Sequence, residues 1–183
     1  ILVYDDHDPL ETATAIAVGG FGAQGRKCSS TSRVYMSKEM RERVWPHLRG
    51  IIDKISIGDV ADFGNFMGAI INEREFNKIV GYLDRARVHP DVTMVFHGKT
   101  TSRLGWFIPP TIIVTENPDY ETVREEIFGP VVTICLVDNM EVARKHFDDS
   151  PYALTGAVHT TNVRQFCQDL QELRFAAGNI YDD

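Results

Sequence analysis

The sequence predicts an α/β fold, a three-layer αβα domain with a mainly parallel sheet. Short apolar runs alternate along the chain with segments of helical periodicity, which is typical of such folds. Residues 131–137 form a run that is apolar except for Thr133, as expected of a strand buried on both faces. The 183 residues are 43% hydrophobic and 25% charged, which supports a single core and argues against disorder.

The first predicted elements are a strand at residues 1–4 and a helix that begins after Asp8. Asp8 is a typical N-cap, because Pro9 occupies the first helical position and Glu11 the third. Apolar residues recur along one predicted face of this helix: Leu10, Ala13, Ala17 and Phe21.

A second strand at residues 33–36 precedes a helix capped by Ser37. Its apolar series consists of Met40, Val44, Leu48, Ile51 and Ile55. Pro46 interrupts this series, so the helix is either kinked there or begins near it. Asn72, with Glu75 three residues later, caps a third helix that stops before Pro90. The apolar face of this third helix carries Phe76, Ile79, Leu83 and Ala86.

The second half of the chain alternates more plainly between the two kinds of element. Predicted strands cover residues 92–96, 111–114, 131–137, 154–159 and 177–181. Predicted helices cover 141–147 and 163–173, and the latter presents Phe166, Leu170 and Leu173 on one side. Strands that alternate with helices predict parallel pairing, because each helix returns the chain to the same edge of the sheet.

Residues 20–25 match the dinucleotide pattern GxGxxG, but their context excludes that function. The fingerprint binds a pyrophosphate where glycines open a helix and its free N–H groups face the ligand. Here the glycines close the helix that began after Asp8, so carbonyl groups and the negative end of the dipole are exposed. We therefore predict a turn that lets the backbone pack closely.

Cys28 follows that turn and is the candidate nucleophile. Its neighbours are Arg26, Lys27, Ser29 and Ser30, and positive charge or backbone N–H groups favour the nucleophilic thiolate. From chemistry alone, a partly buried structural thiol remains the alternative. Cys135 and Cys167 are predicted to be structural, since one lies in an apolar run and the other beside Phe166 on a helix. Three cysteines without framework spacing indicate a reducing compartment.

Charge and composition exclude several classes of partner. The net charge is -7, and basic residues alternate with acidic ones, so no nucleic-acid surface is predicted. No apolar run is long enough to span a bilayer. The six histidines show neither metal-ligand spacing nor a partnership with Cys28, and each is expected at the surface or at its boundary. The acidic residues around His7 fit a helix cap, so no metal is predicted.

Five blocks of the chain, in this order, resemble the catalytic domain of the aldehyde dehydrogenase superfamily. They are residues 25–28 (GRKC), 57–59 (IGD), 105–111 (GWFIPPT), 125–130 (EEIFGP) and 151–158 (PYALTGAV). Within the superfamily, residues 27–29, 154–158 and 176–181 are most similar to the Δ1-pyrroline-5-carboxylate dehydrogenases. These enzymes oxidise L-glutamate γ-semialdehyde to L-glutamate in proline catabolism.

The resemblance implies a role for each matching residue. The Cys28 thiolate would attack the aldehyde carbon, the resulting thiohemiacetal would pass a hydride to NAD+, and water would release the product from a thioester. The Cys28 N–H would be one oxyanion donor. Glu126 and Phe128 would hold the nicotinamide ribose and ring, and Ser29 would help to bind the substrate carboxylate. Arg26 stands where these enzymes usually have Gln.

The resemblance also implies that residues 1–183 are a truncated catalytic domain. The general base and most of the NAD-binding domain would lie upstream, so we expect this fragment to be inactive alone. The longer protein would be a homo-oligomer, in the mitochondrial matrix of a eukaryote or otherwise in the cytoplasm. Three alternatives stay open: another aldehyde substrate such as succinate semialdehyde, a cysteine hydrolase or acyltransferase with a histidine or acid beside Cys28, and a non-enzymatic α/β module.

Overall fold

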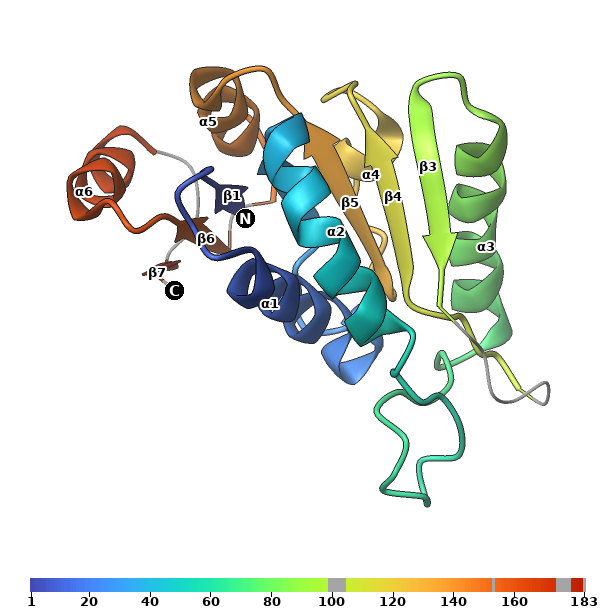
Figure 1. The fold of residues 1–183 in the computed structure, drawn as a ribbon. Coiled ribbons are helices and arrows are strands. Elements are labelled where there is room, and N and C mark those ends of the chain that lie inside the picture. Colours follow the sequence, from blue (N-terminus) through green and yellow to red (C-terminus); the bar gives the residue numbers. More distant parts are fainter. Residues whose placement is uncertain (99–104, 153, 174–178, 183) are drawn as a thin grey trace.

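The chain folds around one seven-stranded sheet (Figure 1). This computed structural model describes residues 1–98, 105–152, 154–173 and 179–182. The strand order is β3-β4-β5-β2-β1-β6-β7. The strands are β1 (Leu2–Val3), β2 (Arg33–Met36), β3 (Val92–His97), β4 (Thr111–Thr115), β5 (Val131–Leu136), β6 (Thr155–His159) and β7 (Asn179–Asp182).

All neighbouring strands except one pair run parallel, which confirms the predicted sheet. β3 pairs with β4 in the antiparallel sense, with Phe96 opposite Ile112. β4 and β5 lie parallel in the centre, with Thr111 opposite Val131, and nearly all of their residues are buried, as their apolar sequences predict. The last predicted strand is observed from Asn179 onward, while residues 177 and 178 lie outside the described residues.

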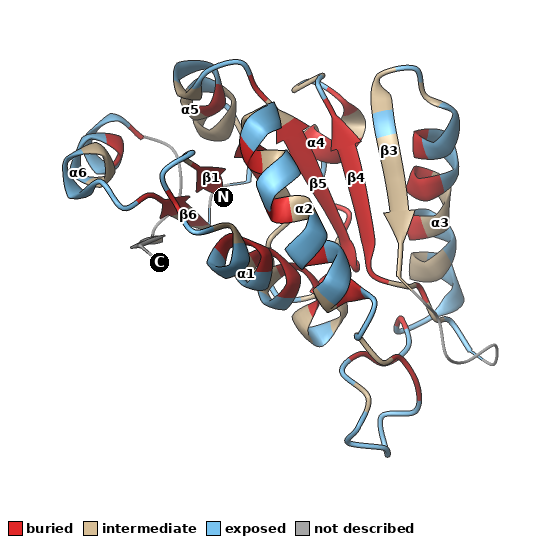
Figure 2. Ribbon diagram, viewed as in Figure 1, coloured by how far each residue is buried: buried red, intermediate tan, exposed pale blue. Residues whose placement is uncertain are grey.

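Helices cover both faces of the sheet and complete the three layers. They are α1 (Pro9–Phe21), α2 (Lys38–Ile52), α3 (Glu73–Val88), α4 (Glu121–Arg124), α5 (Met140–Asp148) and α6 (Val163–Glu172). α1 and α2 lie in front of the strands in Figure 1 and bury one apolar cluster, whereas α3, α4 and α5 bury a second cluster on the opposite face. Figure 2 shows both clusters as buried residues on the strands and on the inner sides of the helices.

The predicted helix starts are confirmed by their capping hydrogen bonds. The Asp8 carboxylate accepts from the backbone N–H groups of Leu10 and Glu11, and Asn72 accepts from Glu75 at 2.9 Å. α2 begins at Lys38 after its Ser37 cap and continues through Pro46. Because Pro46 lies on the exposed side of α2, water can satisfy the carbonyl that loses its helical partner there.

Some burial predictions were wrong. Leu10 is 51% exposed, because the buried face of α1 runs through Ile16 and Phe21. Leu170 is 42% exposed, because α6 places a polar residue, Asp169, on its buried face. Cys167 is also exposed and is not a core residue. Two of the histidines expected near the surface, His7 and His159, are buried with their rings 4.9 Å apart.

Candidate active site

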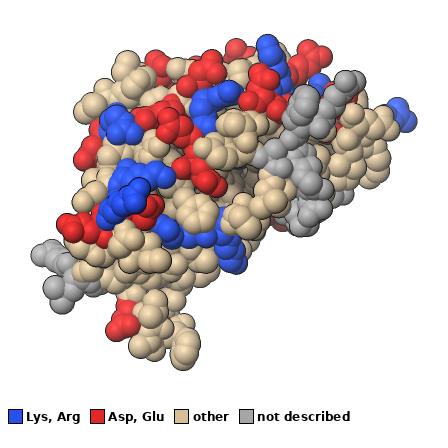
Figure 3. Space-filling view, turned by 180° about the vertical axis from the view of Figure 1, so that it is seen from behind, with Lys and Arg blue, Asp and Glu red and all other residues tan. Residues whose placement is uncertain are grey.

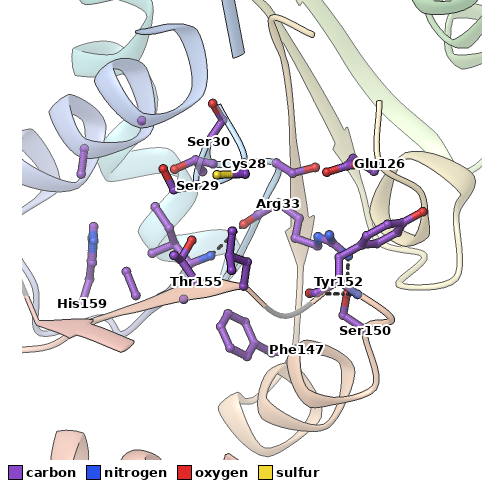
Figure 4. A pocket seen from close by; sticks show the side chains of 18 of the residues that line it. Cys28, Ser29, Ser30, Arg33, Glu126, Phe147, Ser150, Tyr152, Thr155 and His159 are labelled. Carbon is purple, nitrogen blue, oxygen red and sulfur yellow. Dashed lines mark hydrogen bonds between the residues drawn. The ribbon is translucent and has the colours of Figure 1, made fainter. Parts of the chain in front are cut away.

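Three loops meet at the amino ends of parallel strands of the sheet, and they line a pocket of about 750 Å³. The loops precede β2, β5 and β6, which run in the same direction, so their amino ends share one edge. Residues 28–33 form one wall, Glu126 a second, and residues 150–152 with 154–157 a third. The topology therefore brings together segments that lie more than a hundred residues apart in the chain (Figure 4).

The first wall follows the glycine-rich end of α1. A 3-10 turn (Gly22–Gly25) succeeds Phe21, and Ala23, Gln24 and Gly25 all have positive φ. The glycines close a helix, as predicted, so this segment offers no helix start to a phosphate. A Cβ at Gly25 would overlap the carbonyl oxygen of Gly129, so the close contact between the two loops requires glycine here.

Cys28 lies at the tip of a tight turn. The Ser30 N–H donates to the Lys27 carbonyl at 3.0 Å, and the Lys27 N–H donates to Ser30 Oγ at 3.1 Å, which together direct residues 28 and 29 outward. Cys28 is exposed and lines the pocket with Ser29. Cys135, in contrast, is fully buried on β5, and burial raises its thiol pKa to about 12. Of these two thiols, Cys28 is therefore the solvent-accessible one.

The second wall carries an exposed acidic pair, Glu125 and Glu126. The Tyr82 hydroxyl donates to the Glu125 carboxylate, and this hydrogen bond, with burial, raises the Tyr82 pKa to about 12, so the phenol stays protonated. Lys78 Nζ donates to the Glu126 carbonyl at 3.3 Å. The Tyr82 contact holds the Glu125 side chain and the Lys78 contact holds the backbone, and neither uses the exposed Glu126 carboxylate, which lines the pocket.

Phe128 adjoins this wall without lining the pocket itself. It is partly exposed, and its φ of 58° places it in the left-handed region. Arg26, which directly precedes the thiol turn formed by residues 27–30, lies against it. Of the sequence-predicted site residues, Cys28, Ser29 and Glu126 therefore share one cavity, and Phe128 lies two residues beyond it.

Sequence reasoning missed a guanidinium that links the first wall to the third. Arg33 donates to Ser150 Oγ at 2.7 Å and to the Val123 carbonyl at 3.1 Å, and its guanidinium carbon lies 5.6 Å from the Tyr152 ring centroid. Burial lowers the Arg33 pKa, although a guanidinium stays charged at neutral pH. The only available signal was an Arg at the start of an otherwise apolar strand.

A histidine partner for the thiol is not observed. His159 lines the pocket, but in Figure 4 it lies well apart from Cys28, and burial, followed by the N-terminal ammonium and His7, lowers its pKa to about 3. No hydrogen bond joins Cys28 to any histidine within the described ranges. Within the part of the chain that the structure describes, no group of three or more His, Cys, Asp or Glu side chains could bind a metal ion.

The surface carries both signs of charge. Basic and acidic side chains alternate on the face in Figure 3, with no large basic patch on that side. None of the helices in the described part of the chain is both apolar enough and long enough to cross a bilayer.

Comparison with known proteins identifies the family. The sequence profile of the aldehyde dehydrogenase family matches residues 1–182. The chain belongs to the aldehyde dehydrogenase family. This result confirms the resemblance carried by the five sequence blocks and the α/β fold that it implied.

Curated relatives in the family are named Δ1-pyrroline-5-carboxylate dehydrogenases. The mitochondrial enzyme of Dictyostelium discoideum is 37% identical over 166 residues, which cover 89% of this chain and 30% of that protein. The enzyme named 1-pyrroline-5-carboxylate dehydrogenase 1 of Halalkalibacterium halodurans is 33% identical over 181 residues, covering 99% and 34%. The chain thus spans about a third of the length of these relatives.

Solved structures match over nearly the whole chain. The 1-pyrroline-5-carboxylate dehydrogenase from Thermus with bound NAD superposes with a TM-score of 0.87 at 27% identity, covering 99% of this chain and 34% of that chain. Betaine aldehyde dehydrogenase from Staphylococcus aureus, in complex with NAD+, superposes with a TM-score of 0.89 at 28% identity, covering 99% and 36%. Enzymes named for two different substrates match about equally well, so the fold alone does not identify the substrate.

Proposed function

We propose that residues 1–183 are the thiol-bearing domain of an NAD-dependent dehydrogenase that oxidises L-glutamate γ-semialdehyde to L-glutamate in proline catabolism. The observation that carries the proposal is the pocket shared by an exposed thiol, Cys28, and an exposed carboxylate, Glu126, in a chain of this family. The names of the curated relatives support the choice of aldehyde.

The residues on the Glu126 side fit the nicotinamide end of NAD. An exposed carboxylate such as Glu126 can accept hydrogen bonds from ribose hydroxyls, and a partly exposed aromatic ring such as Phe128 can pack against the nicotinamide. NAD+ supplies the hydride acceptor when it is bound. Most of its binding domain would lie in the remainder of a longer polypeptide, as the one-third coverage of the relatives suggests.

Cys28 is proposed to carry out the covalent chemistry. Its thiolate sulfur forms a bond to the aldehyde carbon, and the carbonyl π electrons move to oxygen, where the backbone N–H of Cys28 can donate to the new oxyanion. Loss of hydride from that carbon leaves a thioester on Cys28. The oxygen of water then bonds to the thioester carbon and the carbon–sulfur bond breaks, so the carboxylate departs and the thiolate is restored, while the two protons of water pass to the general base outside these residues and to solvent. Ser29, beside Cys28, would hydrogen-bond the distal carboxylate of the substrate.

The setting of the enzyme follows from the same proposal. The isolated 183 residues would neither bind NAD+ tightly nor turn over, because the general base and most coenzyme contacts would lie outside them. The longer protein would be a homo-oligomer. It would work in the mitochondrial matrix of a eukaryote, as the names of the eukaryotic relatives suggest, and otherwise in the cytoplasm.

A substrate panel tests the proposal. NADH formation is measured for the longer polypeptide that contains this chain, with L-glutamate γ-semialdehyde, succinate semialdehyde and betaine aldehyde compared by kcat/KM. We expect L-glutamate γ-semialdehyde to exceed the others at least about tenfold, and Cys28→Ala to abolish turnover. A preference for succinate semialdehyde would refute the substrate, and NAD-independent hydrolysis of a thioester substrate would favour a cysteine hydrolase.

A further inference from the structure

Arg26 joins the turn that carries Cys28 to the segment that carries Glu126. Its Nη1 donates to the Phe128 carbonyl at 3.4 Å, and its guanidinium carbon lies 5.1 Å from the centroid of the Phe128 ring. Both side chains are partly buried. One guanidinium therefore contacts both the backbone and the ring of the same residue, 102 positions along the chain.

Phe128 needs such support because of its backbone conformation. Its φ of 58° is in the left-handed region, which bulky L residues rarely adopt unless their surroundings impose it. Tyr82 and Lys78, from α3, contact the segment at Glu125 and at the Glu126 carbonyl, before the left-handed residue. Arg26 acts at the left-handed residue itself and from the opposite wall of the site.

We propose that Arg26 is a positioning residue that holds Phe128 in its left-handed conformation against the thiol turn. The contact fixes the Glu126 segment relative to Cys28, so the two walls of the pocket keep a constant separation. Phe128 stays partly exposed while one side of its ring meets Arg26, and the remaining surface is available to a ligand. The contact itself is independent of the coenzyme, whereas its effect on coenzyme binding rests on the proposed function.

Limited proteolysis of the chain tests the local contact without any coenzyme. A glutamate-specific protease cleaves after Glu125 and Glu126 when that segment opens, and cleavage after the exposed loop residue Glu116 in the same sample serves as the internal reference. Because Arg26→Ala removes the stacking contact and the hydrogen bond together, the cleavage ratio should rise roughly tenfold. Arg26→Gln keeps a planar donor of similar length and should raise the ratio about threefold.

The matched control is Arg49→Ala. Arg49 also lies over a phenylalanine, Phe96, at 5.7 Å from guanidinium carbon to ring centroid, but on α2, away from the pocket. We expect it to leave the cleavage ratio unchanged. Wild-type ratios in both Arg26 variants would overturn the proposal, and so would an Arg49→Ala effect equal to that of Arg26→Ala.

Kinetics of the longer enzyme then connect the contact to the coenzyme. Arg26→Ala should raise KM for NAD+ severalfold and leave KM for the aldehyde unchanged, a split that general destabilisation would not produce. Equal increases in KM for NAD+ and KM for the aldehyde would contradict the proposal that Arg26 positions Phe128. If the wild-type enzyme shows no NAD-dependent oxidation, the proposed function fails, whereas the proteolysis result still decides the role of Arg26.

Discussion

Asp169 is the buried centre of a polar network, and its replacement by alanine tests how α6 is held to the sheet. The Asp169 carboxylate is fully buried. It accepts hydrogen bonds from the Tyr4 hydroxyl at 2.7 Å, from Arg144 at 3.2 Å and from Gln165 at 3.1 Å. Tyr4 follows β1 and Arg144 belongs to α5, so one side chain links α6 to two other elements.

The expected loss of stability follows from the fate of the partners. Removing one member of a buried ion pair costs about 3 to 5 kcal/mol, because the other charge remains buried. The Arg144 side chain is 15% exposed and retains Glu172 at 3.5 Å, which favours the lower end. We therefore expect Asp169→Ala to lower the free energy of unfolding by about 3 kcal/mol. For a chain of this length the corresponding fall in Tm is roughly 6 to 12 °C.

Urea unfolding followed by circular dichroism measures this change. Gln168→Ala is the matched control, because Gln168 lies on the same helix and its hydrogen bond to Glu172 is exposed, so its loss should stay within about 0.5 kcal/mol. Tyr4→Phe removes a single hydroxyl and should cost about 1 kcal/mol. An Asp169→Ala variant within about 1 kcal/mol of wild type would refute the argument that the network anchors α6.

Three further predictions concern the site and its surroundings. Gly25→Ala forces a side chain into a backbone with φ of 64° and should cost about 2 kcal/mol in urea unfolding; no loss would contradict the close loop contact. Iodoacetamide at neutral pH should modify Cys28 long before the buried Cys135, and equal labelling by mass spectrometry would contradict their burial. Burial lowers the His159 pKa to about 3, so on acidification the unfolded state binds a proton before the folded state does. The free energy of unfolding should therefore fall as pH drops from about 6.5 towards 3, by at most about 1.4 kcal/mol per pH unit. A His159→Gln variant with the same pH dependence as wild type would argue against this.

The local elements were predictable from sequence because their signals are local. Asp8, Ser37 and Asn72 each satisfy free N–H groups at a helix start, and that chemistry needs no distant partner. The apolar run from residue 131, in which Thr133 is the one hydroxyl side chain, identified β5 as a central strand, since a strand covered on both faces does not alternate apolar with polar residues. The closing glycines before Cys28 were distinguished from a phosphate loop by the position of the helix alone.

The arrangement of the pocket depends on pairings that no local pattern encodes. β1 lies between β2 and β6, so the loop before β6 reaches the thiol only through the strand order. Asp169 is buried because its hydrogen-bond partners, Tyr4 after β1 and Arg144 on α5, lie on that side of α6. Leu170 is exposed as a consequence. The place of Arg33 in the pocket likewise depends on Ser150 and Tyr152, which are distant in sequence and contact it only in the folded chain.

The most direct test of the catalytic thiol is to trap its acyl adduct. The longer enzyme is mixed with L-glutamate γ-semialdehyde and NAD+, quenched in acid during turnover, digested and analysed by peptide mass spectrometry. We expect a thioester of the glutamate γ-carbonyl on the peptide that contains Cys28, with Cys135 and Cys167 unmodified. Turnover that persists in the Cys28→Ala variant, or an acyl group found on another residue, would contradict this expectation.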